Sequence, residues 1–264
     1  MSDQPKRSRK FSAWIALIVA LLAAIAAWVV FDPGFYGAGL AMFTPGMSQE
    51  EFDRRVHDYV MNNPEVIIQA VQGLEARKQR EELTGAQDTL KARADEIFRD
   101  SASPVGGNAQ GDVTLVEFFD YNCPYCRKMA PVLTDAEKAD PQLRIVFKEF
   151  PILGPASEFA ARAALAAQRQ MRYEAFHHAL MAVKEKVDEN NVLTTAASVG
   201  LDVERLKTDM QDPAIQAVID RNMALAAALR INGTPGFVIG DQILRGATEL
   251  NVLQGMISQA RKQK

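Results

Sequence analysis

Both cysteines of the chain lie within four residues, in the run Cys123-Pro124-Tyr125-Cys126. This run directly follows residues 113–120, an apolar stretch rich in β-branched and aromatic residues that predicts a buried strand, and it precedes a helical stretch. A thiol at the start of a helix faces unpaired backbone N–H groups and the positive end of the helix dipole, which favour the thiolate. A second thiol three residues on can attack a mixed disulfide formed by the first, or close a ring with it. The order strand, cysteine pair, helix therefore predicts a redox-active site and limits the folds that can carry it.

Other uses of the cysteine pair are weaker. A structural disulfide would enclose only two residues and would restrict the unfolded chain very little. A zinc site needs about four ligands, and beyond the cysteines the chain offers only His57, His177 and His178. We expect His177 and His178 to be surface or partly buried helix residues, while a Cu(I) site on the two thiolates stays open. We expect no metal and no organic cofactor, because the redox equivalents reside in a Cys123–Cys126 disulfide.

Residues 11–31 form a run of 21 residues without a single charge. At about 1.5 Å per residue, a helix of this length crosses the hydrocarbon core of a bilayer. Residues 1–10 carry four basic side chains against one acidic side chain, so the positive-inside bias predicts a cytoplasmic tip and export of everything after residue 31. We predict a retained transmembrane signal anchor; the alternatives are a cleaved signal peptide, with a small-x-small site at 39–41, and a buried core helix. The protein is therefore expected at the inner membrane facing the periplasm, or free in the periplasm if the signal is cleaved, where a cysteine pair can be oxidised.

Composition excludes several other classes. The chain of 264 residues is 48% hydrophobic and 24% charged, which excludes collagen-like, low-complexity and disulfide-dense proteins. A net charge of −3 argues against a broad nucleic-acid-binding surface. The length allows one large domain or two smaller ones.

The region before the cysteine pair predicts a linker followed by helices. Residues 32–47 are rich in Gly and Pro and predict the linker. Ser48 and Glu51 fit a capping box at a helix start, and Asn63-Pro64 predicts a second start, with Asn63 as the cap and Pro64 at the first helical position. The apolar stripe of residues 48–102 is too narrow to build a core of its own, so this segment is expected to self-associate or to pack on a neighbouring domain. A solvated spacer is the alternative.

A break rich in turn residues at 103–111 predicts a domain boundary, and residues 103–264 have the pattern of an α/β domain. The first strand and the cysteine pair are followed by a second strand, a helical block, a hairpin of two short strands and a closing helix. These elements are expected at 143–150, 155–230, 236–240, 242–245 and 248–262.

Three separated motifs in this domain resemble one known family. The run 117–126 (EFFDYNCPYC) looks like the active-site strand and helix start of the DsbA-like branch of the thioredoxin superfamily. Residues 147–154 (FKEFPILG) resemble its second strand, Gly233-Thr234-Pro235 resembles its loop with a cis-proline, and the helical block matches its helical insertion. Residues 59–66 (YVMNNPEV) are similar to the N-terminal segment of ScsC and Com1-type proteins. The resemblance implies an α/β thioredoxin-like fold with a helical insertion, preceded by an all-helical segment. The uncharged run at 11–31 adds an N-terminal transmembrane helix to this expected architecture.

Within the cysteine motif, we expect each residue to have its own role. Cys123, first at the helix start and the more exposed of the two, is the candidate nucleophile. Cys126, shielded in the first turn, is the candidate resolving thiol. Pro124 and Tyr125 lie between them and are expected to tune the redox potential.

The resemblance implies further site residues. Glu117 would be a buried acid that assists proton transfer at Cys126; the alternative is a strand residue that faces solvent or pairs with Lys148, itself a weaker candidate for the same network. Thr234 and Pro235 would face the cysteines, and a cis peptide there would expose the Thr234 backbone for pairing with an extended substrate strand.

These features predict an exported thiol–disulfide oxidoreductase, an oxidase or an isomerase, that acts on cysteine-containing polypeptides. An unidentified recycling protein, expected in the membrane, would restore its redox state. Self-association through residues 48–100 would favour isomerisation, and a monomer would favour dithiol oxidation. The alternative from another class is a non-enzymatic Cu(I)-binding or holdase module that uses the same thiol pair and groove. No nucleic-acid partner is expected.

Overall fold

The computed structural model describes residues 46–263 of the chain. The predicted tip at 1–10, the predicted membrane segment at 11–31 and the candidate cleavage site at 39–41 lie outside these residues and stay predictions. Within the described part of the chain, no helix is both long enough and apolar enough to cross a bilayer.

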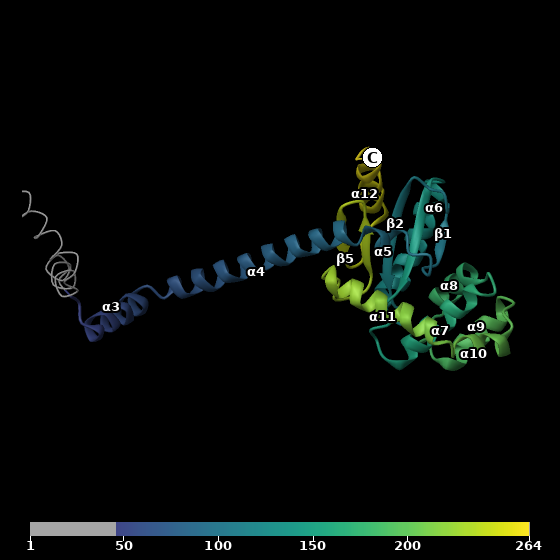
Figure 1. Ribbon diagram of the computed structural model, residues 1–264, viewed down its shortest axis with the longest axis horizontal. Coiled ribbons are helices and arrows are strands. Elements are labelled where there is room, and N and C mark those ends of the chain that lie inside the picture. Colours follow the sequence, from purple (N-terminus) through teal and green to yellow (C-terminus); the bar gives the residue numbers. More distant parts are fainter. Residues whose placement is uncertain (1–45, 264) are drawn as a thin grey trace, which may run out of the picture. The chain divides into compact units, whose positions relative to one another are not determined.

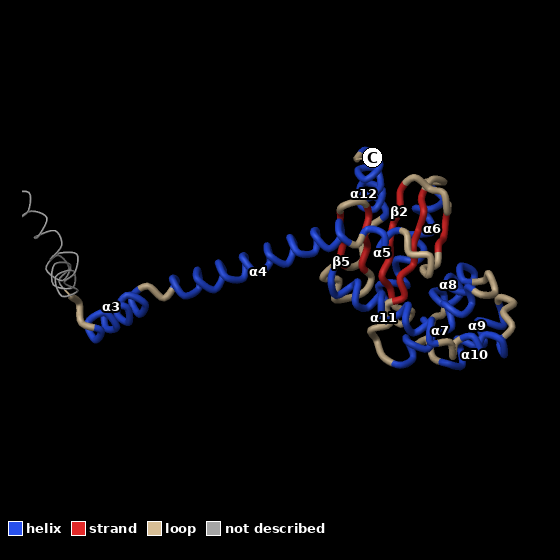
Figure 2. Tube along the Cα trace, in the orientation of Figure 1, coloured by secondary structure: helices blue, strands red, loops and turns tan. Residues whose placement is uncertain are grey.

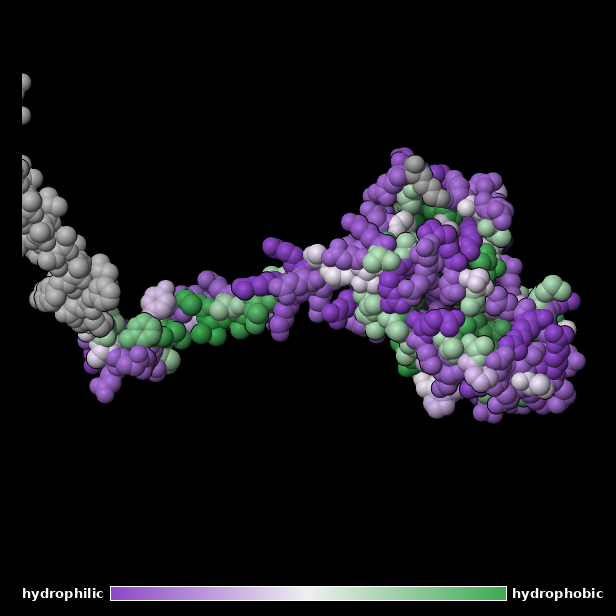
Figure 3. All heavy atoms as spheres, viewed as in Figure 1, coloured by the Kyte–Doolittle hydropathy of each residue, from purple (hydrophilic) through white to green (hydrophobic). Residues whose placement is uncertain are grey.

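The chain divides into two compact units, Met1–Leu74 and Glu75–Lys264. In the first unit, α3 (Gln49–Asn62) starts after Ser48, whose hydroxyl accepts the backbone N–H of Glu51 at 3.2 Å. Helix α4 (Glu65–Ala92) starts in the first unit and ends in the second. Hydrophobic side chains gather along α3 and the first half of α4 (Figure 3), and they stay exposed: Phe52, Val56, Tyr59, Ile67, Ile68, Val71 and Leu74.

The second unit is built on a five-stranded sheet in the order β1-β3-β2-β4-β5 (Figure 2). Its two central strands, β2 (Val113–Phe119) and β3 (Leu143–Glu149), run parallel, and the other neighbours are antiparallel. The remaining strands are β1 (Val105–Gly107), β4 (Gly236–Ile239) and β5 (Gln242–Arg245). The four strands expected from the sequence are confirmed.

Strand β1 lies where the sequence predicts only a domain boundary. Its glycines hide it from a pattern search, because they read as a turn. Gly106 is needed there, since a Cβ at this position would lie 2.9 Å from the ring of Phe147 on the neighbouring strand.

Alternate residues of the central strands face two separate cores. Odd-numbered positions of β2 and β3 pack with α6 (Pro124–Ala139) and α12 (Leu250–Lys262), and the two cysteines lie in this core. Even-numbered positions pack with α11 (Pro213–Ala228), α5 (Ala94–Phe98) and the end of α4, where Leu90 and Ile97 are buried. The last part of the helical segment thus packs on the sheet, as the sequence allowed.

The helical block expected between β3 and the hairpin is confirmed. It consists of α11 and four helices that precede it, and α8, α9 and α10 lie together as a helical lobe in Figure 1. The four are α7 (Pro155–Gln168), α8 (Tyr173–Ala182), α9 (Glu189–Ser198) and α10 (Val203–Asp209).

Candidate active site

Cys123 occupies the N-cap position of α6, with Pro124 in the first helical turn. Both cysteines are free thiols in this structure, and Cys123 is 4% exposed. A hydrogen bond from the Cys126 thiol, together with the backbone N–H groups of Cys126 and Tyr125, lowers the pKa of Cys123 to about 5, although burial acts in the opposite direction. Cys123 is therefore a thiolate at neutral pH, the form that attacks disulfides.

Cys126 is fully buried one turn into α6. Burial raises its pKa above the usual range, and its hydrogen bond to Cys123 and the nearby charge of Glu117 act in the same direction. The two thiols therefore differ strongly in acidity, and Cys126 needs a base before it can react.

The loop before β4 places Thr234 and Pro235 beside the cysteines. The Thr234–Pro235 peptide is cis, as the family resemblance implies. The carbonyl oxygen of Thr234 lies 3.2 Å from Cys123 Sγ, although 111 residues separate the two in sequence. The structure thus brings the predicted substrate-contact residues to the predicted nucleophile.

Glu117 lies on β2, on the sheet face that carries the cysteines, and is 1% exposed. Neither of its carboxyl oxygens has a hydrogen-bond partner. Burial, with a smaller contribution from the Cys123 charge, raises the pKa of Glu117 to about 8. A buried acid with free oxygens close to Cys126 has the properties of a proton acceptor for that thiol.

Lys148 does not belong to this network, and the expectation that it could pair with Glu117 is wrong. In the β2–β3 register Lys148 lies beside Phe118, so it faces the opposite side of the sheet from Glu117. Its ammonium donates hydrogen bonds to the Glu96 carbonyl at 2.8 Å, to Asp100 Oδ2 at 3.1 Å and to Ser103 Oγ at 2.8 Å. Lys148 therefore ties the segment around α5 to the sheet.

Sequence reasoning missed a second buried acid. Glu149 is 1% exposed, and its Oε1 accepts hydrogen bonds from the hydroxyls of Tyr121 at 3.1 Å and Tyr173 at 2.8 Å. Tyr121 also lies 3.2 Å from Nδ1 of His177, which is buried rather than on the surface. The signal in the sequence was an acidic residue in the strand 143–150, whose other residues are apolar or basic.

Two polar side chains that the sequence analysis did not single out, Asn122 and Arg127, hold the start of α6 against the helical insertion. Arg127 donates hydrogen bonds to the carbonyls of Tyr121, Val183 and Glu185 at 2.8 to 2.9 Å. Asn122 bonds both backbone groups of Val187. These contacts hold the first turn of α6, next to Cys123, in place. Tyr125, which lies between the two cysteines, is by contrast 62% exposed.

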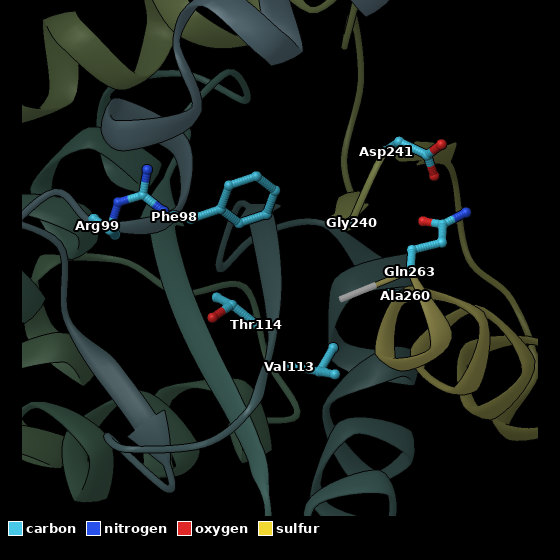
Figure 4. A pocket seen from close by; sticks show the side chains of 8 residues that line it. All are labelled: Phe98, Arg99, Val113, Thr114, Gly240, Asp241, Ala260 and Gln263. Carbon is cyan, nitrogen blue, oxygen red and sulfur yellow. The ribbon is translucent and has the colours of Figure 1, made fainter.

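A pocket of about 290 Å³ lies elsewhere in the second unit, where the start of β2 meets the β4–β5 turn and the end of α12 (Figure 4). Thr114 and Asp241 line it, but none of the predicted site residues does. In the described residues there is also no group of three or more His, Cys, Asp or Glu side chains that could hold a metal ion.

Comparison with known families matches residues 114–258 to the DSBA-like thioredoxin domain. The chain belongs to the DSBA-like thioredoxin family. Members of this family are thiol:disulfide oxidoreductases, and the α/β thioredoxin-like fold expected from the sequence is confirmed. Residues 49–81 match a second family model, the copper resistance protein ScsC N-terminal domain, so the expected ScsC-type helical segment is also confirmed.

Individual relatives agree with this family. A thioredoxin-like oxidoreductase from Silicibacter pomeroyi is 52% identical, and the match covers 64% of this chain and 97% of that one with a TM-score of 0.63. ScsC from Proteus mirabilis is 28% identical over 85% of this chain and all of that one, with a TM-score of 0.62. The thiol:disulfide interchange protein DsbA of Bordetella parapertussis is 27% identical over 60% of this chain and 82% of its own length.

Some curated relatives are much longer proteins. The chain matches Na(+)/H(+) antiporter NhaA of Herminiimonas arsenicoxydans at 29% identity over 60% of its own length. It spans only about a quarter of that relative, so the likeness concerns one part of the antiporter chain.

Proposed function

We propose that this protein is an exported thiol–disulfide oxidoreductase that exchanges disulfides with cysteine-containing polypeptides through Cys123. The observation that carries the proposal is the contrast between the two thiols. The fold lowers the pKa of Cys123 to about 5 and raises that of Cys126. An acidic first thiol attacks or leaves readily, and a buried second thiol resolves the intermediate.

The exchange proceeds in two steps. The Cys123 thiolate attacks one sulfur of a substrate disulfide, forms a mixed disulfide and displaces the other substrate sulfur as a thiolate. Cys126 then gives its proton to Glu117 and attacks Cys123 Sγ, which forms the Cys123–Cys126 disulfide and releases the second substrate thiolate. The reverse sequence oxidises a substrate dithiol, so the redox state of the pair decides the direction.

Substrate binding is assigned to the Thr234 backbone, whose carbonyl lies 3.2 Å from Cys123 Sγ. An extended substrate segment that pairs there places its own sulfur next to the nucleophile. The exposed Tyr125 adds an aromatic surface beside the thiol.

The remaining parts of the proposal concern location and partners. The uncharged run at 11–31 supports anchoring in the inner membrane with the thiol domain in the periplasm, or a periplasmic protein if the run is cleaved. A membrane-bound redox protein would recycle the pair. The exposed apolar side chains of α3 and α4 support self-association, which favours isomerisation over simple oxidation.

Replacing Cys123 tests the activity directly. Cys123→Ser is expected to abolish both insulin reduction and the refolding of scrambled ribonuclease, because no thiolate is left to attack. Cys126→Ser should still form mixed disulfides but should release them slowly. Wild-type activity in Cys123→Ser would refute the proposal.

The alternative, a redox-silent Cu(I)-binding or holdase module, is not favoured by membership of an oxidoreductase family. It makes an opposite prediction for the wild-type protein, namely tight Cu(I) binding without exchange activity.

A further inference from the structure

Glu149 lies next to Glu117 on the same face of the sheet. In the parallel β2–β3 register Glu117 pairs with Phe147 and Glu149 pairs with Phe119, so the two acids are diagonal neighbours. Their side chains both enter the core that holds the cysteines, and both are 1% exposed. Diagonal neighbours on adjacent strands are within reach of long side chains.

The two acids present free oxygens in this core. Both oxygens of Glu117 and Oε2 of Glu149 are buried without a hydrogen-bond partner, whereas Oε1 of Glu149 accepts two tyrosine hydroxyls. Buried carboxyl oxygens without partners are costly and rare, and a proton on one of them removes most of the cost. Burial raises the pKa of Glu117 to about 8, so Glu117 holds a proton at neutral pH, and burial also raises the pKa of Glu149 well above its usual value.

A protonated Glu117 cannot simply take the proton of Cys126. It has to release its own proton from one oxygen while the other oxygen accepts. The receiving group must lie nearby, and the free Oε2 of Glu149 is the buried carboxyl oxygen on the adjacent strand.

A hydrogen-bonded chain continues from Glu149 toward the surface. Its Oε1 contacts the Tyr121 hydroxyl at 3.1 Å, and that hydroxyl lies 3.2 Å from Nδ1 of His177. Burial lowers the pKa of His177 to about 3, so its ring is neutral and can accept a proton at one nitrogen while it releases one from the other. The His177 ring centre lies 5.5 Å from that of His178, whose side chain is 42% exposed.

The other titratable groups around this chain come from β2, α6 and α8. Asp120 lies close to Glu149, but its oxygens accept the backbone N–H groups of Asn122 and Leu153. The remaining groups that face the two acids are Cys123, Cys126, Tyr121, Tyr173 and His177.

We propose that Glu149 is a positioning and proton-relay residue of the thiol site, which connects Glu117 through Tyr121 and His177 to the partly exposed His178 and so to solvent. This inference rests on the proposed exchange activity and deepens it. It assigns the route by which the Cys126 proton leaves a core closed to water.

Each proton moves by one bond. The Cys126 S–H bond breaks and its proton binds one oxygen of Glu117, whose other oxygen releases a proton to Oε2 of Glu149. In the neutral form that the relay uses, Glu149 carries its proton on Oε1 and donates it to the Tyr121 oxygen, and Tyr121 donates to Nδ1 of His177, so the Glu149–Tyr121 bond runs opposite to its direction with an ionised Glu149. Oε1 then releases its proton to the Tyr121 oxygen, and the Tyr121 proton passes to Nδ1 of His177. Nε2 of His177 releases a proton to the neighbouring His178, whose side chain is 42% exposed and passes a proton to water. The electrons change place only among the sulfurs, when the Cys126 thiolate attacks Cys123 Sγ and displaces the bound thiolate.

The test uses the full-length reduced protein and 5,5′-dithiobis(2-nitrobenzoate), which releases one coloured thiolate per step. The first phase reports attack by Cys123 and the second reports resolution by Cys126. In Glu149→Gln, which keeps an oxygen for both tyrosines, the first phase should keep its rate. The second phase should slow by about tenfold. This is less than the full contribution of positioned proton transfer, because Glu117 is still present to accept the Cys126 proton. Tyr121→Phe should behave in the same way.

Tyr173→Phe is the matched control. It removes one hydroxyl from the same carboxyl oxygen but leaves the chain from Glu149 through Tyr121 to His177 intact, so its second phase should stay close to wild type. A proton inventory in mixed light and heavy water should be curved for wild type, because several protons move, and linear for Glu149→Gln.

The outcomes separate the two proposals. A wild-type protein that releases no coloured thiolate refutes the exchange activity itself. A normal first phase together with a second phase in Glu149→Gln at the wild-type rate refutes only the relay. Equal slowing in Tyr173→Phe and Tyr121→Phe would also refute it, because the hydroxyls would then act by holding the structure.

Discussion

At the scale of single residues, the fold shifts the pKa values of two identical side chains in opposite directions. Cys123 at the start of α6 receives hydrogen bonds that stabilise its negative charge, whereas Cys126 one turn later is fully buried. A stabilised thiolate favours the reduced form of the pair, because the disulfide cannot use those hydrogen bonds. The acidity of one sulfur therefore sets the redox direction of the protein.

The first prediction concerns that acidity. Alkylation of Cys123 by iodoacetamide should follow a single inflection near pH 5, and its rate should fall below that pH as the thiolate is protonated. Cys126→Ala removes the hydrogen bond that lowers the Cys123 pKa most, so the inflection should move to higher pH. An inflection near pH 9 in the wild-type protein would contradict the structure.

A second prediction follows for the redox potential. Because the fold lowers the Cys123 pKa, the reduced protein gains stability as the pH rises from about 5 toward the unfolded value near 9, and loses it as the pH falls through 5. At neutral pH the reduced form already has part of this extra stability. A more stable reduced form makes the cysteine pair a stronger oxidant, so its potential should be less negative than that of thioredoxin, about −270 mV. Equilibration with glutathione at pH 7 measures it.

A third prediction concerns Glu117, whose pKa shift has the opposite sign for stability. Its pKa rises from 4.5 to about 8, so the fold disfavours its charge and loses stability as the pH increases through that window. Glu117→Gln should therefore be as stable as wild type near pH 4 and clearly more stable near pH 8, while its resolution step slows by roughly 10². Urea unfolding at both pH values checks this, with the exposed Glu158→Gln as control.

At the scale of elements, the sequence predicted the cysteine strand, its helix, the helical block and the hairpin, because their apolar patterns are strong. It could not show which way β3 faces, because nearly every side chain in this strand is buried and no alternation of polar and apolar residues remains. For this reason the sequence leaves Lys148 as a weaker candidate for the thiol network and does not single out Glu149. Only the pairing with β2 resolves the two faces.

The helical segment also differs from its sequence pattern, both at the end of α3 and along α4. Asn63 was expected to cap the start of the next helix, but its side chain bonds the Tyr59 carbonyl and closes α3. Helix α4 continues through the charged run at 75–82, because Glu, Arg, Lys and Gln are good helix formers even where the apolar stripe is interrupted. The spacing of apolar residues alone therefore predicts neither the role of Asn63 nor the helix through residues 75–82.

The fourth prediction belongs to β3 and α5. Lys148→Ala should lower the free energy of unfolding by about 3 kcal/mol, since it leaves Asp100 without its buried cation and removes bonds to Glu96 and Ser103. Alkylation of Cys123 should keep its rate, because Lys148 lies on the other face of the sheet. Urea unfolding and alkylation measure the two, with the exposed Lys138→Ala as control. Loss of reactivity without loss of stability would contradict this placement.

At the scale of the whole molecule, the second unit carries the DSBA-like thioredoxin domain, while the described part of the first unit, residues 46–74, has an exposed apolar surface. Phe52, Val56, Ile67 and Leu74 are 45 to 53% exposed on α3 and the start of α4. Contiguous apolar surface of this kind marks an interaction site.

The fifth prediction follows from that surface. The full-length protein should sediment as an oligomer at micromolar concentration, and Val56→Asp combined with Ile67→Asp should shift it to the monomer by placing charges on the contact. Exchange by Cys123 on small disulfides should stay normal, whereas isomerisation of scrambled ribonuclease should fall. If the wild-type protein sediments as a monomer, self-association is refuted and the argument for isomerase activity fails with it.

The near-complete enclosure of Cys123, 4% exposed beside the Thr234 carbonyl, also decides which clients the protein can serve. A cysteine beneath the surface of a folded protein reaches such a site less easily than a cysteine on a flexible, extended segment. We therefore expect unfolded or partly folded polypeptides to exchange disulfides with Cys123 faster than the same polypeptides after folding.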